Sequence, residues 1–155
     1  MTDRRSISAP DIPEHVNPIP AATRIGNLLF SSAVGGEDPE THELPADKEA
    51  QIANVFTTIR AIMREAGGSP ANIGKMSVYV ADRDDRKLIN PHWLKMFPDE
   101  GSRPVRHTSG KTLPAGRHIR GEFIAVFWPG RCGGRGRGRG EGRRRGRPPA
   151  RRGRG

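Results

Sequence analysis

The chain of 155 residues carries 27 Lys and Arg against 17 Asp and Glu, a formal charge of +10 that suggests a nucleic-acid-binding protein. All of the excess lies in residues 131–155, because residues 1–130 contain sixteen basic and sixteen acidic side chains. A neutral body has no net field to attract phosphate, so composition disfavours nucleic-acid binding by the body. The single cysteine excludes a disulfide within one chain, and no apolar run reaches the roughly 18 residues of a membrane span.

Composition divides the chain into three segments. Residues 1–15 are proline-rich and are predicted to form an extended N-terminal arm, and residues 16–130 have the length of one domain. Residues 131–155 are an Arg/Gly-rich tail that cannot bury a core and is predicted to be disordered. The start lacks a signal-peptide pattern and no zinc-type spacing of Cys and His occurs, so we expect a cytoplasmic protein without a metal site.

The first predicted elements are a hairpin and a long helix. Residues 22–34 contain two short apolar runs around Gly26-Asn27, a pair typical of a tight turn. A helix is predicted to begin after Asp47, which can cap its first turn, and to end at Gly67-Gly68. Apolar residues three or four apart form its stripe: Ile52, Val55, Phe56, Ile59, Ile62, Met63 and Ala66.

The second half of the chain predicts a strand, a helix and two more strands. Residues 73–80 end in alternating apolar residues. Residues 84–97 are predicted to form a helix that contains Pro91, with an apolar stripe of Ile89, Trp93, Met96 and Phe97. Two extended segments near 104–112 and 118–127 follow, around the turn at Leu113-Pro114. The order ββαβαββ, with hairpins expected at both ends, predicts an α+β domain with one mixed sheet and two helices on one face.

The last strand indicates what lies on each face of that sheet. Its odd-numbered residues from 119 to 127 are apolar or glycine and suit packing beneath the helices. The other face presents Arg120, Glu122, Ile124 and Val126. Two helices cannot cover both faces of a sheet, so we expect the second face to meet another subunit.

Several segments, taken in order, resemble the RidA family (YjgF, or reactive intermediate deaminase), whose older names are L-PSP endoribonuclease and translation initiation inhibitor. The resemblance spans about residues 16–127. The matching segments are Ser31-Ser32, LPAD at 44–47, EAG at 65–67, VYVAD at 78–82, Ile89-Asn90, PVR at 104–106, Leu113-Pro114 and EFIAV at 122–126.

The resemblance implies a chorismate-mutase-like fold and a homotrimer with clefts between neighbouring subunits. It also implies cofactor-independent hydrolysis of enamine and imine intermediates of amino acids, such as 2-aminoacrylate, to a 2-keto acid and ammonia. Arg106 matches the family arginine that holds the substrate carboxylate, and its fork of donors fits that group. Asn90 and Ser32 match other positions that line the cleft.

Four substrate-cleft positions depart from the resemblance. Ala33 stands where a glycine is common, Ile19 where many members have a tyrosine, and Thr108 in place of a frequent cysteine. Arg120 stands where the deaminases have a glutamate that positions the attacking water.

The missing acid leaves the catalytic group open. A guanidinium stays protonated and cannot act as a base, so Glu122 and His107 are the remaining candidates. The segment 106–113 is one residue shorter than usual, and a one-residue shift in a strand moves side chains to the other face, so Glu122 could replace the acid. If Arg106 and Arg120 share one cleft, they could grip two carboxylates and favour a dicarboxylic imine.

Two other functions remain open at this point. The first is a trimer that binds a carboxylate-bearing metabolite without turnover, because the usual acid is absent. The second is an RNA-binding protein or endoribonuclease that acts as a translation inhibitor. The tail at 131–155 could bind RNA or other polyanions weakly and non-specifically, or be an extension without function.

Overall fold

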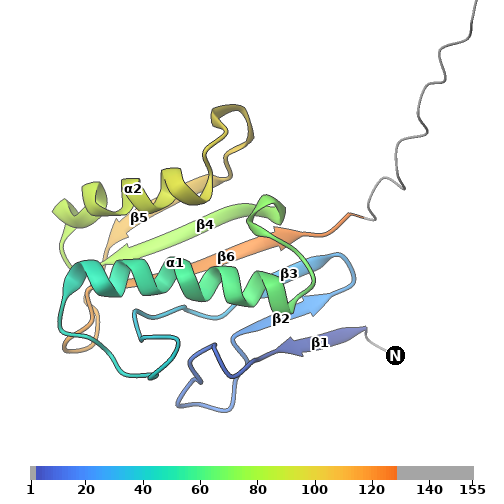
Figure 1. Cartoon of the computed structure of the whole chain (residues 1–155), viewed down its shortest axis with the longest axis horizontal. Coiled ribbons are helices and arrows are strands. Elements are labelled where there is room, and N and C mark those ends of the chain that lie inside the picture. Colours follow the sequence, from blue (N-terminus) through green and yellow to red (C-terminus); the bar gives the residue numbers. More distant parts are fainter. Residues whose placement is uncertain (1–2, 129–155) are drawn as a thin grey trace, which may run out of the picture.

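The computed structural model describes residues 3–128 of the chain. One six-stranded sheet has the order β1-β2-β3-β6-β4-β5, with β4 and β5 parallel and every other pair antiparallel. Both α-helices lie on the same side of this sheet (Figure 1), so the predicted architecture is confirmed. The elements are β1 (Arg4–Ile7), β2 (Ala22–Ile25), β3 (Leu28–Ser31), α1 (Lys48–Glu65), β4 (Ile73–Val80), α2 (Arg86–Met96), β5 (Val105–Gly110) and β6 (Ile119–Val126).

The first hairpin and the limits of α1 follow the sequence prediction. Ile25 pairs with Leu28, which leaves a two-residue turn in which Gly26 adopts a left-handed φ of +56°. Asp47 caps α1, since its carboxylate accepts a hydrogen bond of 2.7 Å from the backbone nitrogen of Ala50.

Two features of the sheet differ from the prediction. Residues 4–7, expected in an extended arm, form β1 and pair with β2, because every proline of the arm lies after Ile7. The hairpin expected at the C-terminal end is wrong: β5 and β6 are consecutive in the chain, but β4 lies between them. β6 therefore occupies a central position in the sheet, and β5 becomes an edge strand parallel to β4.

The two faces of β6 differ as the alternation predicts. Ile119, Phe123 and Ala125 are at most 3% exposed and pack in the core beneath the helices. The opposite face, which we call the open face, is not covered by any helix of residues 3–128 (Figure 1). Three apolar side chains lie on it with about 40% of their surface exposed: Leu28, Phe30 and Ile124.

A buried glutamine ties the loops around the sheet to α1. The amide nitrogen of Gln51 donates to the carbonyl oxygens of Pro45 and Gly116, both at 2.7 Å, and its oxygen accepts from the backbone nitrogen of His118 at 2.9 Å. A Cβ on Gly36 would come within 2.5 Å of Gln51 Cβ, so only glycine lets this loop approach the helix so closely.

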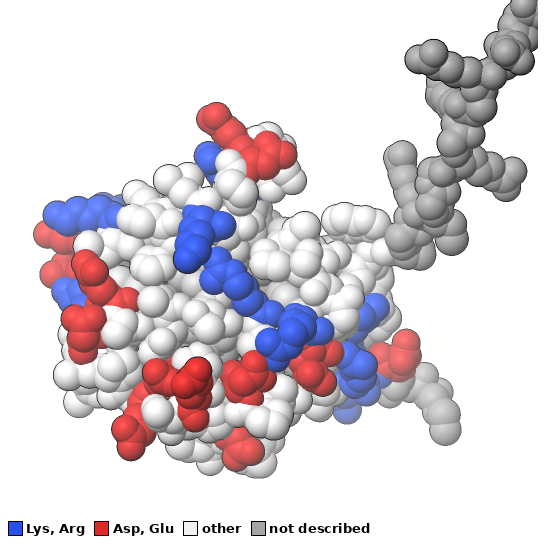
Figure 2. Space-filling model, in the orientation of Figure 1, with Lys and Arg blue, Asp and Glu red and all other residues white. Residues whose placement is uncertain are grey.

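Charges on the described part of the protein are mixed. On the face shown in Figure 2, basic side chains form a diagonal band and acidic side chains gather below it, so neither sign covers the face. This pattern agrees with the equal numbers of acidic and basic residues in 1–130. The predicted disordered tail lies outside the described residues.

Within residues 3–128, no helix combines the length and the apolarity that crossing a membrane requires.

Replacing Gln51 with methionine should lower the free energy of unfolding by about 2–4 kcal/mol, because three backbone groups lose their buried partner. Urea unfolding followed by circular dichroism measures the change. Thr57→Ala, at an exposed position of the same helix, should stay within about 0.5 kcal/mol of the wild type. Equal losses in both variants would contradict the proposed role of the amide.

Candidate functional site

Arg106 lies on the face of β5 that packs against α2. It pairs with buried Met76 of β4, and its Nη2 donates a hydrogen bond of 2.8 Å to Oδ1 of Asn90 on α2. The guanidinium carbon lies 4.9 Å from the ring centre of Trp93, which is about one turn further along α2 than Asn90. Asn90 and Trp93, three residues apart on the helix, thus hold the guanidinium from two sides.

One end of this guanidinium has no partner. Arg106 Nη1 and the neighbouring Thr108 Oγ1 are buried, and neither forms a hydrogen bond with any described residue. Desolvation lowers the pKa of Arg106 from its ordinary value, but a guanidinium remains charged at neutral pH. A partly buried cation with an unpaired donor is suited to bind a carboxylate.

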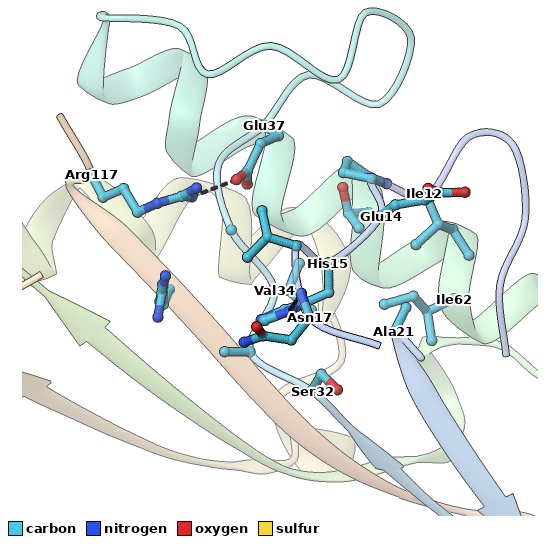
Figure 3. A pocket seen from close by; sticks show the side chains of 16 residues that line it. Ile12, Glu14, His15, Asn17, Ala21, Ser32, Val34, Glu37, Ile62 and Arg117 are labelled. Atoms are coloured by element: carbon cyan, nitrogen blue, oxygen red, sulfur yellow. Dashed lines mark hydrogen bonds and ion pairs between the residues drawn. The ribbon is translucent and has the colours of Figure 1, made fainter. Parts of the chain in front are cut away.

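A second group of predicted residues lies around a cavity of about 340 Å³, shown in Figure 3. Ser32, Ala33 and Arg120 line it together with the loop of residues 12–17. The hydroxyl of Ser32 donates to the carbonyl oxygen of Pro20 at 2.6 Å, which leaves its lone pairs available to a ligand. The volume falls at the lower end of the roughly 300–1,000 Å³ typical of small-molecule sites.

An ion pair forms one wall of this cavity. Arg117 Nη1 lies 2.5 Å from Glu37 Oε1, and the dashed line in Figure 3 marks the contact. A Cβ on Gly35 would lie 2.0 Å from Glu37 Oε2, so a larger residue at this position would clash with the Glu37 carboxylate.

The structure places Glu122 and Ile19 elsewhere. Glu122 lies on the open face, where its Oε1 accepts a hydrogen bond of 2.6 Å from the hydroxyl of Tyr79. His107 is exposed on that same face, one position from Arg106 in an alternating strand. Ile19 is 47% exposed and lines an adjoining groove along the N-terminal arm, which shares several lining residues with the cavity.

One chain does not bring the two groups together. Ser32 follows β3 and Arg106 lies on β5, with β6 and β4 between them, a separation on the order of 14 Å at the usual strand spacing. Arg120 pairs with Tyr79 and Arg106 with Met76, so the two arginines also project from opposite faces of the sheet. A three- or four-carbon ligand cannot touch both groups within one chain.

The sequence profile described as Endoribonuclease L-PSP matches residues 10–126. The chain belongs to this family. A RutC family protein of Aquifex aeolicus is 33% identical over 123 residues, which cover 79% of this chain and 98% of the relative. The 2-iminobutanoate/2-iminopropanoate deaminase of Escherichia coli is 28% identical over 124 residues, covering 79% of this chain and 97% of the enzyme.

A solved structure supports the same assignment. The RidA protein of an Antarctic Psychrobacter species superposes with a TM-score of 0.74 at 31% identity, covering 79% of this chain and 99% of the other. The fold and the RidA/YjgF family membership predicted from the sequence are thereby confirmed, and the family includes proteins named as imine deaminases.

Sequence reasoning missed three neighbours of these residues. The apolar stripe of the second predicted helix indicates a core position for Trp93, and the structure shows that Trp93 also forms the cation–π contact with Arg106. Tyr79 was not singled out as the partner of Glu122, and Arg117 was not connected with Glu37. Only the Trp93 contact had a signal in the sequence, its three-residue spacing from Asn90.

Tyr79 is the only tyrosine of the chain, so its ionisation can be followed alone. The hydrogen bond to Glu122, with burial adding to it, raises the pKa of Tyr79 above its ordinary value. Because the folded-state pKa is the higher one, this interaction stabilises the protein fully below the unfolded pKa, and the stabilisation is lost as pH rises through the folded pKa.

Glu122→Gln should lower the midpoint of phenolate absorbance relative to wild type, measured by ultraviolet titration. A wild-type midpoint at or below about 10, the ordinary tyrosine value, would contradict the hydrogen bond.

Proposed function

We propose that this protein is a cofactor-independent deaminase that hydrolyses 2-imino acids, and the enamines that tautomerise to them, to a 2-keto acid and ammonia. The observation that carries the proposal is the guanidinium of Arg106, which Asn90 and Trp93 hold while its Nη1 forms no hydrogen bond within residues 3–128. The family membership supports it, since two relatives that are 28% identical to this chain are named as 2-iminobutanoate/2-iminopropanoate deaminases.

Hydrolysis of a 2-imino acid mainly requires that the substrate and a water molecule be positioned correctly. The oxygen of a water molecule forms a bond to C2, the C–N bond breaks, and both protons of the water leave with nitrogen as ammonia. Arg106 holds the carboxylate attached to C2, and a hydrogen bond to a charged group contributes about 1.5–3 kcal/mol. A 2-imino acid is already reactive toward water, so orientation in a cleft provides much of the acceleration.

The proposed cleft lies between two subunits of a homotrimer. Arg106, Asn90 and Thr108 of one subunit would face Ser32, Ala33 and Arg120 of its neighbour, because one chain keeps these groups apart. The exposed apolar side chains of the open face supply a surface that such an assembly would bury.

A second candidate is the same assembly acting as a carboxylate-binding protein without turnover. It is favoured by an observation on the acids of the described residues. Glu122 is bound to Tyr79 on the open face. Of the two acids that line the cavity, Glu37 is paired with Arg117 and Glu14 is exposed on a loop. A base fixed beside the ligand would then be lacking for proton transfer. Release of ammonia from freshly generated imine distinguishes the two candidates.

Arg106→Gln should lower kcat/KM for hydrolysis of 2-iminobutanoate by about 10- to 100-fold, the equivalent of one charged hydrogen bond. The imine is generated in place by an amino acid oxidase, and its decay is followed with semicarbazide as a trap. Arg4→Gln, which removes an exposed arginine of β1, should behave as wild type. Equal activity of the Arg106→Gln and Arg4→Gln variants would contradict the role proposed for Arg106.

Phe30→Asp should prevent assembly and abolish hydrolysis together, because it places a charge on the open face. Leu94→Asp is the matched control: Leu94 is 49% exposed but lies on α2, on the helical side of the sheet, and should leave assembly intact. Sedimentation velocity measures the mass. A Phe30→Asp protein that keeps the wild-type mass would contradict the proposed interface.

A further inference from the structure

Arg120 gives the cavity of Figure 3 a positive charge that no ion pair within residues 3–128 neutralises. It lines the cavity together with Ser32 and Ala33, and no ion pair or side-chain hydrogen bond joins it to any residue between 3 and 128. The other arginine of the cavity, Arg117, is already paired with Glu37. A guanidinium cannot lose its charge, so Arg120 requires solvent or an anionic ligand as its partner.

A second polar group in the same cavity also lacks a partner. Thr58 of α1 lines the cavity and is 3% exposed, yet its Oγ1 forms no hydrogen bond with the described residues. Leaving a buried hydroxyl unpaired is unfavourable, and a ligand oxygen that accepts from it would remove that cost. The lining of one cavity thus contains a cationic residue, Arg120, and a hydroxyl-bearing residue, Thr58, and this combination suits a carboxylate.

The acidic residues of the cavity do not cancel this preference. Glu37 is engaged by Arg117, and Glu14 is exposed on the loop of residues 12–17, where water and salt screen its charge. Glu14 lies across the cavity from Arg117 in Figure 3. His15, on the same loop, adds no negative charge in either protonation state.

We propose that the cavity around Arg120 is a subsite for a second carboxylate, so that the preferred substrate is a four- or five-carbon 2-imino dicarboxylic acid. The inference rests on the proposed function, in which Arg106 of another subunit holds the carboxylate next to the imine carbon. Hydrolysis gives a 2-keto dicarboxylic acid and ammonia: water adds to C2, the C–N bond breaks, and no atom is oxidised or reduced. A cavity of about 340 Å³ has room for the longer chain.

The kinetic test compares 2-iminosuccinate with 2-iminobutanoate, both generated in place by oxidases acting on aspartate and 2-aminobutanoate. For the full-length protein, the ratio of kcat/KM for the diacid to that for the monoacid should exceed one. Arg120→Gln should lower this ratio at least about tenfold, as loss of a charged hydrogen bond implies, and Arg120→Glu should lower it further. Arg120→Lys should retain most of it, and Arg4→Gln all of it. A ratio that is the same in wild type and Arg120→Gln overturns the subsite.

A binding test keeps the subsite separate from catalysis. Calorimetry should show tighter binding of 2-oxoglutarate than of 2-oxobutanoate, with the difference reduced in Arg120→Gln and in Thr58→Val, which keeps the shape of the side chain. If neither imine is hydrolysed above its spontaneous rate, the deaminase proposal fails. The difference in affinity between 2-oxoglutarate and 2-oxobutanoate then remains as the test of whether the subsite exists. Equal affinity for the two keto acids in wild type overturns it.

Discussion

The position of β4 between β5 and β6 is the constraint on which the arrangement of the candidate site residues depends. Because β5 pairs with β4 in parallel, Arg106 comes to lie beside Met76, on the face that packs against α2. That face supplies Asn90 and Trp93, which fix the guanidinium. If β5 and β6 had formed a hairpin instead, Arg106 would adjoin β6 and lose its place at the edge of the sheet.

This constraint also explains which part of the structure could be predicted from the sequence. The helical stripe of α1, its cap at Asp47 and the turn at Gly26 are local patterns, and each is found where the spacing placed it. The position of β6 depends on which strands it pairs with across the sheet, and alternation within β6 carries no information on that choice. The hairpin predicted around Leu113-Pro114 was wrong for this reason.

In the candidate site, too, local patterns could be predicted from the sequence, whereas features that depend on strand pairing could not. Alternation along β5 accounts for the position of His107 on the face opposite Arg106, and the family resemblance pointed to Asn90 and Ser32. Neither source could show that Arg106 and Ser32 lie in separate groups within one chain, because that separation follows from the strand order. The contact of Glu122 with Tyr79 joins residues 43 positions apart, and it likewise required the register of β4 and β6.

The buried amide of Gln51 has a consequence for how specificity can change in this protein. It fastens the loops at Pro45 and Gly116 to α1, and α1 also carries Thr58 into the wall of the cavity. Backbone movements that pull either loop away from α1 must break hydrogen bonds of this amide. With the loops held to α1 in this way, the binding preference of the cavity changes most directly by exchange of single lining side chains, and a reversal of charge needs only one residue.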